Sequence, residues 1–127
     1  NPEPKFNAVI GSSMGGLISL YIGLKYPDAF GRVGVFSPSL WFSPKVFEYV
    51  SKYKRRADQK IYLLAGEKES ETLVEDMKML EHHLYKAGYK DEDYVKMKIA
   101  PDGRHSEWFW SREFTEALEY LFEIRKN

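Results

Sequence analysis

The sequence predicts an α/β fold, and two observations carry that prediction. Four short apolar runs typical of buried strands recur along the chain, at residues 6–10, 32–37, 60–66 and 94–100. Each run is followed by a segment that favours a helix, so strand and helix alternate four times. Strands separated by helices of this length pair in parallel, because a parallel neighbour needs a long crossover connection. We therefore expect a parallel sheet with helices packed on it.

The first strand and the first helix meet at a glycine-rich turn. Residues 6–10, Phe-Asn-Ala-Val-Ile, form a short apolar run. The helix that follows is predicted from four apolar residues at helical spacing, namely Leu17, Leu20, Tyr21 and Leu24. Proline disfavours helical geometry in the residue before it, so Pro27 ends this helix at Tyr26.

The second strand and helix are separated by a loop rich in serine and aromatic residues. The strand covers residues 32–37 and ends before Pro38. Pro44 is a suitable first residue for a short helix that reaches about residue 53, because its fixed backbone angle matches the helix. The charge run at residues 54–56, Lys-Arg-Arg, is expected to be a solvated surface.

The last two strand and helix pairs are the most regular. Residues 60–66 form the clearest buried strand, and residues 94–100 form the fourth. A long helix over about residues 71–87 ends at Gly88, and the final helix covers roughly residues 107–124. The apolar stripe of the long helix consists of Leu73, Met77, Leu80 and Leu84.

Composition excludes several classes of function. The chain has 127 residues, enough for one domain, with 19 basic and 19 acidic side chains. Without a basic excess, nucleic acid is not an expected partner, and no apolar run is long enough to span a membrane. The absence of cysteine excludes disulfides and thiol catalysis and leaves the cellular compartment open. No histidine pair with a third ligand appears at usable spacing, so we expect no metal and no cofactor.

Residues 11–15, Gly-Ser-Ser-Met-Gly, are the most informative motif because they fit the Gly-x-Ser-x-Gly pattern of a nucleophile elbow. Such a turn, between a strand and a helix, holds Ser13 in a strained and exposed position. We expect Gly11 and Gly15 to be required because a larger side chain would collide in so tight a turn. The backbone N–H of Met14 would then contribute to an oxyanion hole.

Other interpretations of this turn are a helix N-cap and a phosphate-binding loop. Ser13 could simply cap the following helix. Residues 11–16 lack the Gly-x-Gly-x-x-Gly spacing of dinucleotide-binding turns, and no Lys-Ser or Lys-Thr pair follows to bind a phosphate. We therefore favour the elbow.

The partners of Ser13 should lie in the other loops at the carboxyl ends of the strands, where parallel sheets bind ligands. The fourth loop holds His105, whereas His82 and His83 lie within the long helix and are expected at the surface. An imidazole can take the serine proton and return it, and a carboxylate can fix the tautomer of the imidazole. Position alone leaves this carboxylate open, the candidates being Glu67, Glu69, Glu71 and Asp102.

The chain resembles the putative esterase family of α/β-hydrolases over nearly its whole length. That family includes enterochelin esterases, S-formylglutathione hydrolases and feruloyl esterases. The resemblance is carried by four segments, residues 11–17, 26–31, 36–41 and 103–108. It implies that the acid stands three residues after Gly66, at Glu69, with Glu67 and Glu71 as alternatives. Some siderophore esterases resemble a Ser-His dyad instead.

The family also has strands ahead of its elbow, which this chain lacks. The resemblance therefore implies that the chain is the C-terminal half of an α/β-hydrolase fold, with four parallel strands in sequential order. The N-terminal strands, and the loop that gives the second oxyanion N–H, would be absent. The elbow strand would then be an open edge, so we expect residues 1–127 to be a fragment of a single domain whose sheet a missing N-terminal segment or a second copy completes.

These observations predict a serine hydrolase that cleaves a small-molecule carboxylic ester through an acyl-enzyme. Ser13 is the predicted nucleophile, His105 the base and then acid, and Glu69 the group that orients His105. The predicted walls of the substrate pocket are Trp41, Phe42 and Trp108. An acyltransferase with the same triad, or a non-catalytic interaction domain on the same scaffold, are the alternatives.

Overall fold

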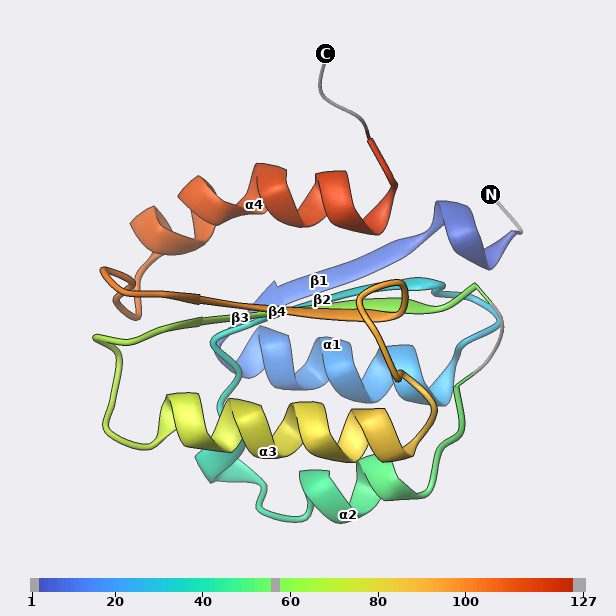
Figure 1. The fold of residues 1–127 in the computed structure, drawn as a ribbon, viewed down its shortest axis with the longest axis horizontal. Helices are drawn as coiled ribbons and strands as arrows, with labels where there is room; N and C mark the ends of the chain where they lie inside the picture. The colour runs from blue at the N-terminus through green and yellow to red at the C-terminus, as the bar shows by residue number, and fades with distance from the viewer. Residues whose placement is uncertain (1–2, 56–57, 125–127) are drawn as a thin grey trace.

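The protein has three layers, with a sheet between two layers of helices (Figure 1). The computed structural model describes residues 3–55 and 58–124. The sheet contains β1 (Ala8–Ser12), β2 (Arg32–Phe36), β3 (Lys60–Gly66) and β4 (Val95–Ala100). All three neighbouring pairs are parallel and the order is β1-β2-β3-β4, as predicted. All four strands therefore end on the same side.

The helices cover both faces of this sheet. In Figure 1, α4 lies on one face, and the other three helices lie on the opposite face. The bounds are α1 (Met14–Lys25), α2 (Val46–Ser51), α3 (Leu73–Lys86) and α4 (Glu107–Leu121). None of the described helices combines the length and the apolar character needed to cross a membrane.

The first strand, the short helix and the long helix each begin about two residues later than expected, the long helix at Leu73. Residues Pro4–Phe6 form a short 3-10 helix, so the first strand begins at Ala8 and continues to Ser12. The short helix begins at Val46, because Pro44 lies in the loop that follows a 3-10 turn at Leu40–Phe42.

The core lies on both sides of the two central strands. Every residue of β2 is buried, and so is every residue of β3 after the first, because each face is covered by helices. One cluster fills the space between the sheet and α1, α2 and α3, and a smaller cluster lies under α4. All five residues of β1, by contrast, are only half-buried.

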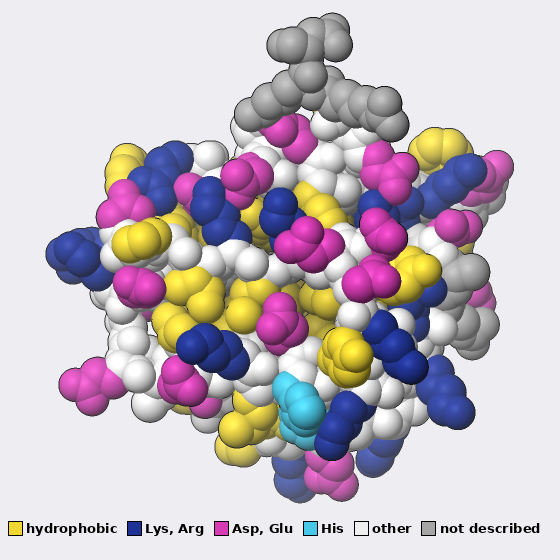
Figure 2. All heavy atoms as spheres, in the orientation of Figure 1, with side chains coloured by type: hydrophobic (Ala, Val, Ile, Leu, Met, Phe, Trp, Pro, Cys, Tyr) yellow, Lys and Arg dark blue, Asp and Glu magenta, His cyan; other side chains and the backbone are white. Residues whose placement is uncertain are grey.

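The prediction that the charged residues 54–56 form a solvated surface is wrong at Arg55. Its guanidinium lies 3.4 Å from the centre of the Tyr94 ring, and its Nε atom is buried. A planar guanidinium is weakly hydrated and stacks well on an aromatic face, which explains why a charged residue covers the core here. Arg56 lies outside the described residues. Elsewhere on the face in Figure 2, basic and acidic side chains are intermingled.

Candidate active site

Ser13 lies in the turn between β1 and α1 with an unusual backbone conformation, φ 59° and ψ −124°. Few non-glycine residues adopt a positive φ, and the surrounding structure has to hold it. The Ser13 N–H donates to the Phe36 carbonyl at 2.9 Å, and the Ser13 carbonyl accepts from the Ser39 N–H at 3.1 Å. The Ser13 side chain makes no capping hydrogen bond to α1, so it does not act as the N-cap that was the alternative interpretation.

Only one of the two glycines that were predicted to be required around Ser13 is sterically constrained. A Cβ atom on Gly11 would lie 2.3 Å from the Gly15 carbonyl oxygen, so Gly11 is required as predicted. A Cβ on Gly15 would meet nothing within 4 Å among the described residues, so that prediction is wrong. Gly16 is the second constrained position, since its Cβ would lie 2.8 Å from the Phe36 carbonyl oxygen.

The structure brings Ser13, His105 and Glu69 together at the carboxyl ends of the strands. The His105 Nε2 atom lies 2.9 Å from the Ser13 hydroxyl, and Nδ1 lies 2.7 Å from Oε1 of Glu69. An ionised carboxylate can only accept a hydrogen bond, so Nδ1 donates to Glu69. The lone pair of Nε2 then faces the Ser13 hydroxyl, as a general base requires.

The two partners of Ser13 differ strongly in exposure. The Glu69 side chain is 2% exposed, whereas the His105 side chain is 47% exposed. The imidazole can therefore be reached from solvent while the carboxylate behind it is protected from water.

The other candidate acids lie elsewhere. Glu67 and Glu71 are exposed in the loop between β3 and α3. Asp102 forms a bidentate ion pair with Arg112, in which the longer N–O distance is 2.8 Å. Hydrogen bonding to the Arg112 guanidinium lowers the pKa of Asp102 to about 2. Asp102 thus fastens the loop that carries His105 to α4.

The two remaining histidines lie on α3, away from Ser13. His82 is exposed, as predicted. His83 is half-buried, with its ring against Phe47 and its Nδ1 atom 3.2 Å from the Ser51 hydroxyl. Burial, with the neighbouring His82, lowers the pKa of His83 below its usual value.

Two residues that the sequence did not single out hold Glu69 in place. The Ser37 hydroxyl donates to Oε2 of Glu69 at 2.6 Å, and the Gly66 N–H donates to the same oxygen at 2.7 Å. Ser37 in turn accepts a hydrogen bond from the Trp110 indole at 2.8 Å. The available signals were that Ser37 ends the predicted second strand within segment 36–41 of the family resemblance, and that Trp110 lies one helical turn beyond Ser106, the N-cap of α4.

Of the three predicted pocket residues, only Trp41 lines the hollow next to His105. A hollow of about 330 Å³ is lined by His105 and Glu69 together with Trp41, Ser39 and Leu73. Phe42 packs edge-on against Trp41, with 5.9 Å between the ring centres, and does not line this hollow. The exposed Trp108 lies under the Arg112 guanidinium, 4.9 Å away, and also lies outside the hollow.

Met14, the predicted oxyanion donor, is the first residue of α1. Its N–H therefore has no carbonyl partner within the helix and lies at the positive end of the helix dipole. The described residues hold no group of three histidine, aspartate or glutamate side chains that could bind a metal ion.

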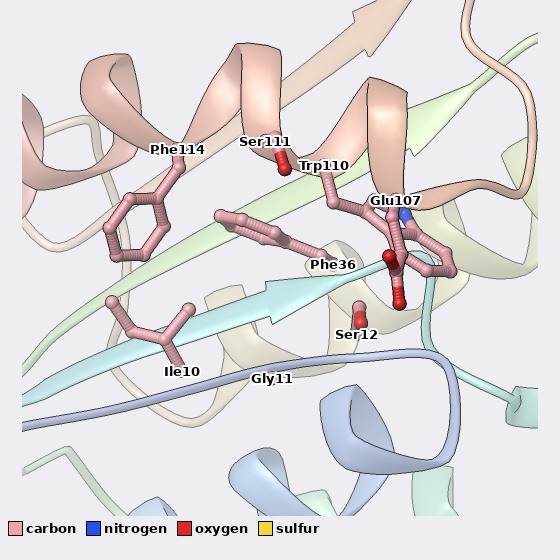
Figure 3. A pocket seen from close by; sticks show the side chains of 8 residues that line it. All are labelled: Ile10, Gly11, Ser12, Phe36, Glu107, Trp110, Ser111 and Phe114. Carbon is pink, nitrogen blue, oxygen red and sulfur yellow. The ribbon is translucent and has the colours of Figure 1, made fainter.

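A second hollow, of about 380 Å³, lies between β1 and α4 (Figure 3). Its apolar walls are Ile10, Phe36 and Phe114, and its polar end holds Ser12 and Glu107. Trp110 extends from α4 into the same end, and its ring also contacts His105.

Comparison with known proteins identifies the family of this chain and supports its fold. Residues 1–121 match the family described as "Putative esterase". The chain belongs to the Putative esterase family. The predicted resemblance is therefore confirmed, and so is the prediction of an α/β fold with four parallel strands.

Individual relatives are longer than this chain. An uncharacterized protein, YbbA of Bacillus subtilis (strain 168), is 27% identical over 94% of this chain and 50% of its own length. The enterobactin esterase FES from Shigella flexneri aligns over 97% of this chain and 33% of its own, with a TM-score of 0.82 and 24% identity. A feruloyl esterase module from Clostridium thermocellum aligns over 98% and 48%, with a TM-score of 0.73 and 17% identity. The chain thus spans between a third and half of these relatives, and the two solved structures show the shared fold.

Proposed function

We propose that this protein is a serine hydrolase that cleaves a small-molecule carboxylic ester. The observation that carries the proposal is the unbroken hydrogen-bonded path from the Ser13 hydroxyl through His105 to Glu69, with distances of 2.9 and 2.7 Å. Membership of an esterase family supports it, and so do the names of the two solved structures, both of which are esterases.

The reaction would proceed through an acyl-enzyme. The Ser13 oxygen attacks the ester carbonyl carbon while His105 Nε2 takes the hydroxyl proton, and the carbonyl oxygen becomes an oxyanion. The Met14 N–H stabilises that oxyanion. When the tetrahedral intermediate collapses, the bond between the carbonyl carbon and the leaving oxygen breaks. His105 gives its proton to that oxygen, which leaves as an alcohol. Water then attacks the acyl-enzyme by the same steps and releases the acid and Ser13.

Glu69 acts without giving up or taking a proton. It fixes the tautomer of His105 and stabilises the imidazolium that forms during each attack. Its burial suits this role, since a carboxylate with few water contacts interacts more strongly with a neighbouring cation.

The substrate would bind in the hollow lined by Trp41, Ser39 and Leu73. This wall is mainly apolar with hydroxyl groups at its edge, which favours an ester with an apolar or aromatic part. Phe42 would act indirectly, by packing against Trp41.

Labelling by a fluorophosphonate tests the proposal, because this reagent reacts covalently only with an activated serine. We expect the wild-type protein to be labelled on Ser13 and Ser13→Ala to remain unlabelled. Ser12→Ala, which removes the adjacent hydroxyl on the α4 side of the turn, is the matched control and should be labelled like the wild type. Equal labelling of Ser13→Ala and the wild type would contradict the proposal and favour a non-catalytic interaction domain.

Product analysis then separates hydrolysis from acyl transfer. With a small chromogenic ester and excess glycerol, a hydrolase releases free acid as its main product. A new glycerol ester as the main product would instead identify an acyltransferase that uses the same residues.

A further inference from the structure

Ser37 and Trp110 form a hydrogen-bonded pair beside the candidate acid, in which Ser37 contacts the Glu69 carboxylate. Resting on the function proposed above, we propose that these two residues form a positioning pair that fixes the Glu69 carboxylate so that Oε1 points at His105. The pair joins β2 to α4 through a bond between residues 73 positions apart in the sequence.

The direction of each hydrogen bond in the pair follows from the chemistry of its groups. The Trp110 indole nitrogen can only donate, so Ser37 accepts at this contact of 2.8 Å. The single hydrogen of the Ser37 hydroxyl is then free for Oε2 of Glu69, 2.6 Å away. A separation of 2.6 Å is typical of a hydroxyl that donates to an ionised carboxylate. Trp110 thus orients the hydroxyl, and the hydroxyl orients the carboxylate.

The two oxygens of Glu69 have different partners. Oε2 accepts from both Ser37 and the Gly66 N–H, whereas Oε1 contacts His105. A rotation of the carboxylate that turned Oε1 away from His105 would break the two bonds to Oε2. Without the Ser37 hydroxyl, the Gly66 N–H alone would oppose that rotation.

The backbone of Ser37 is buried and strained. Ser37 is 1% exposed, its φ is 45°, and its N–H donates to the Leu64 carbonyl at 2.8 Å. A positive φ is unfavourable for serine, and glycine would adopt it without strain. The site therefore carries a strained residue whose hydroxyl reaches Glu69, where glycine would suit the backbone better.

Trp110 also contacts the base directly. Its ring is perpendicular to the His105 ring, at 87°, with 4.9 Å between the ring centres. One residue of α4 thus braces the imidazole with its ring and the carboxylate with its N–H, through Ser37.

Two separate variants of Ser37 distinguish the effect of losing the hydroxyl from the effect of relieving the backbone strain. We expect Ser37→Ala and Ser37→Gly each to lower kcat by about 10- to 100-fold, the range for loss of one hydrogen bond to a charged group, with KM little changed. Glycine should not restore activity, although it relieves the backbone. If Ser37→Gly matched the wild type while Ser37→Ala did not, only the backbone would matter and the inference would be overturned.

Trp110→Phe removes the indole N–H and keeps a ring beside His105. We expect its kcat to fall by about the same factor as that of Ser37→Gly, and the double variant to fall no further, because both changes break one chain of bonds. Trp108→Phe is the matched control on the same helix, where the ring is exposed and lies outside the hollow. Multiplied losses in the double variant would overturn the inference.

A measurement that does not depend on turnover completes the test. In proton NMR, the His105 Nδ1 hydrogen shared with Glu69 gives a low-field signal, which should shift or broaden in Ser37→Gly and persist in Trp108→Phe. An unchanged signal in Ser37→Gly would overturn the inference. Fluorophosphonate labelling of the wild type separates this result from failure of the proposed function, which would abolish labelling of the wild type itself.

Discussion

The candidate active site has two sides that are built differently, one at the end of β1 and one at the end of β3. β1 carries the nucleophile, pairs only with β2 among the described strands, and is half-buried throughout. β3 leads to the acid, lies between two strands, and is buried almost entirely. The Ser13 backbone is held by hydrogen bonds to the backbone of Phe36 and Ser39, whereas the Glu69 carboxylate is held by the Ser37 hydroxyl and the nearby Gly66 N–H. The candidate nucleophile thus depends on backbone contacts with the end of β2 and the loop after it, whereas the candidate acid depends on a side-chain hydroxyl from that loop.

The largest expected effect comes from the acid, on the buried side. Glu69→Gln should lower kcat by about 10⁴-fold, the loss seen when the acid of a serine protease triad becomes an amide, because His105 is then held in the wrong tautomer. Steady-state hydrolysis of a small chromogenic ester measures it. The exposed Glu67→Gln, two residues earlier, is the control. A loss of less than tenfold for Glu69→Gln would indicate a Ser-His dyad.

A pair of valines tests the difference in burial between the edge and the centre of the sheet. Val9 on β1 and Val33 on β2 are direct partners in the register. Val33 is fully buried against Gly23, so Val33→Ala should lower the free energy of unfolding by about 2 to 3 kcal/mol, from lost transfer energy and the cavity left behind. Val9→Ala should cost about half as much.

Urea unfolding of both variants measures these free energies. Equal losses would mean that the β1 edge is covered in solution as thoroughly as the centre of the sheet. That result would mean that the Ser13 side of the site, at the end of β1, is as buried as the Glu69 side, at the end of β3.

The smallest expected effect concerns the ion pair that fastens the His105 loop to α4. Arg112 lowers the folded-state pKa of Asp102 to about 2, below the ordinary value of 3.8. A depressed pKa means that the pair stabilises the folded protein above about pH 4 and that this contribution is lost as the pH falls toward 2. Asp102 is exposed, so the gain is small.

Urea unfolding of the wild type and Asp102→Asn between pH 2 and 6 measures this contribution. The wild type should be the more stable above pH 4, and the two curves should meet near pH 2. A difference that grew on acidification would show that the sign of this coupling is wrong.

Short-range patterns explain what could be predicted of the fold and the site. The strand and helix alternation followed from apolar periodicity, and the elbow followed from Gly11, Ser13 and the strand before them. His105 could be singled out because His82 and His83 lie within a helix. Each of these inferences needs only a few neighbouring residues, since local sterics and hydrogen bonding decide them.

Helix phase and burial decided what the pattern could not. Trp108 and Trp110 are two residues apart, but only Trp110 reaches His105, because the stripe of α4 that contains Phe109 and Glu113 faces the sheet. Gly15 matched the motif, whereas Gly16 is the residue that approaches the Phe36 backbone. The first distinction requires knowing which face of α4 packs on the sheet, and the second requires knowing which backbone packs against the turn at Ser13.

The sequence by itself determined the α/β class, the family, and the positions of Ser13 and His105 on loops at one edge of the sheet. The family resemblance already implied Glu69 as the acid. The tertiary structure decided that its side chain faces His105, while Glu67 and Glu71 are exposed and Asp102 pairs with Arg112. It also decided that Ser37 donates a hydrogen bond to Glu69 and accepts one from Trp110. The reason is that the pattern of strands and helices places each loop at the end of its strand. The directions of the Glu69, Ser37 and Trp110 side chains depend instead on contacts between residues 32 to 73 positions apart.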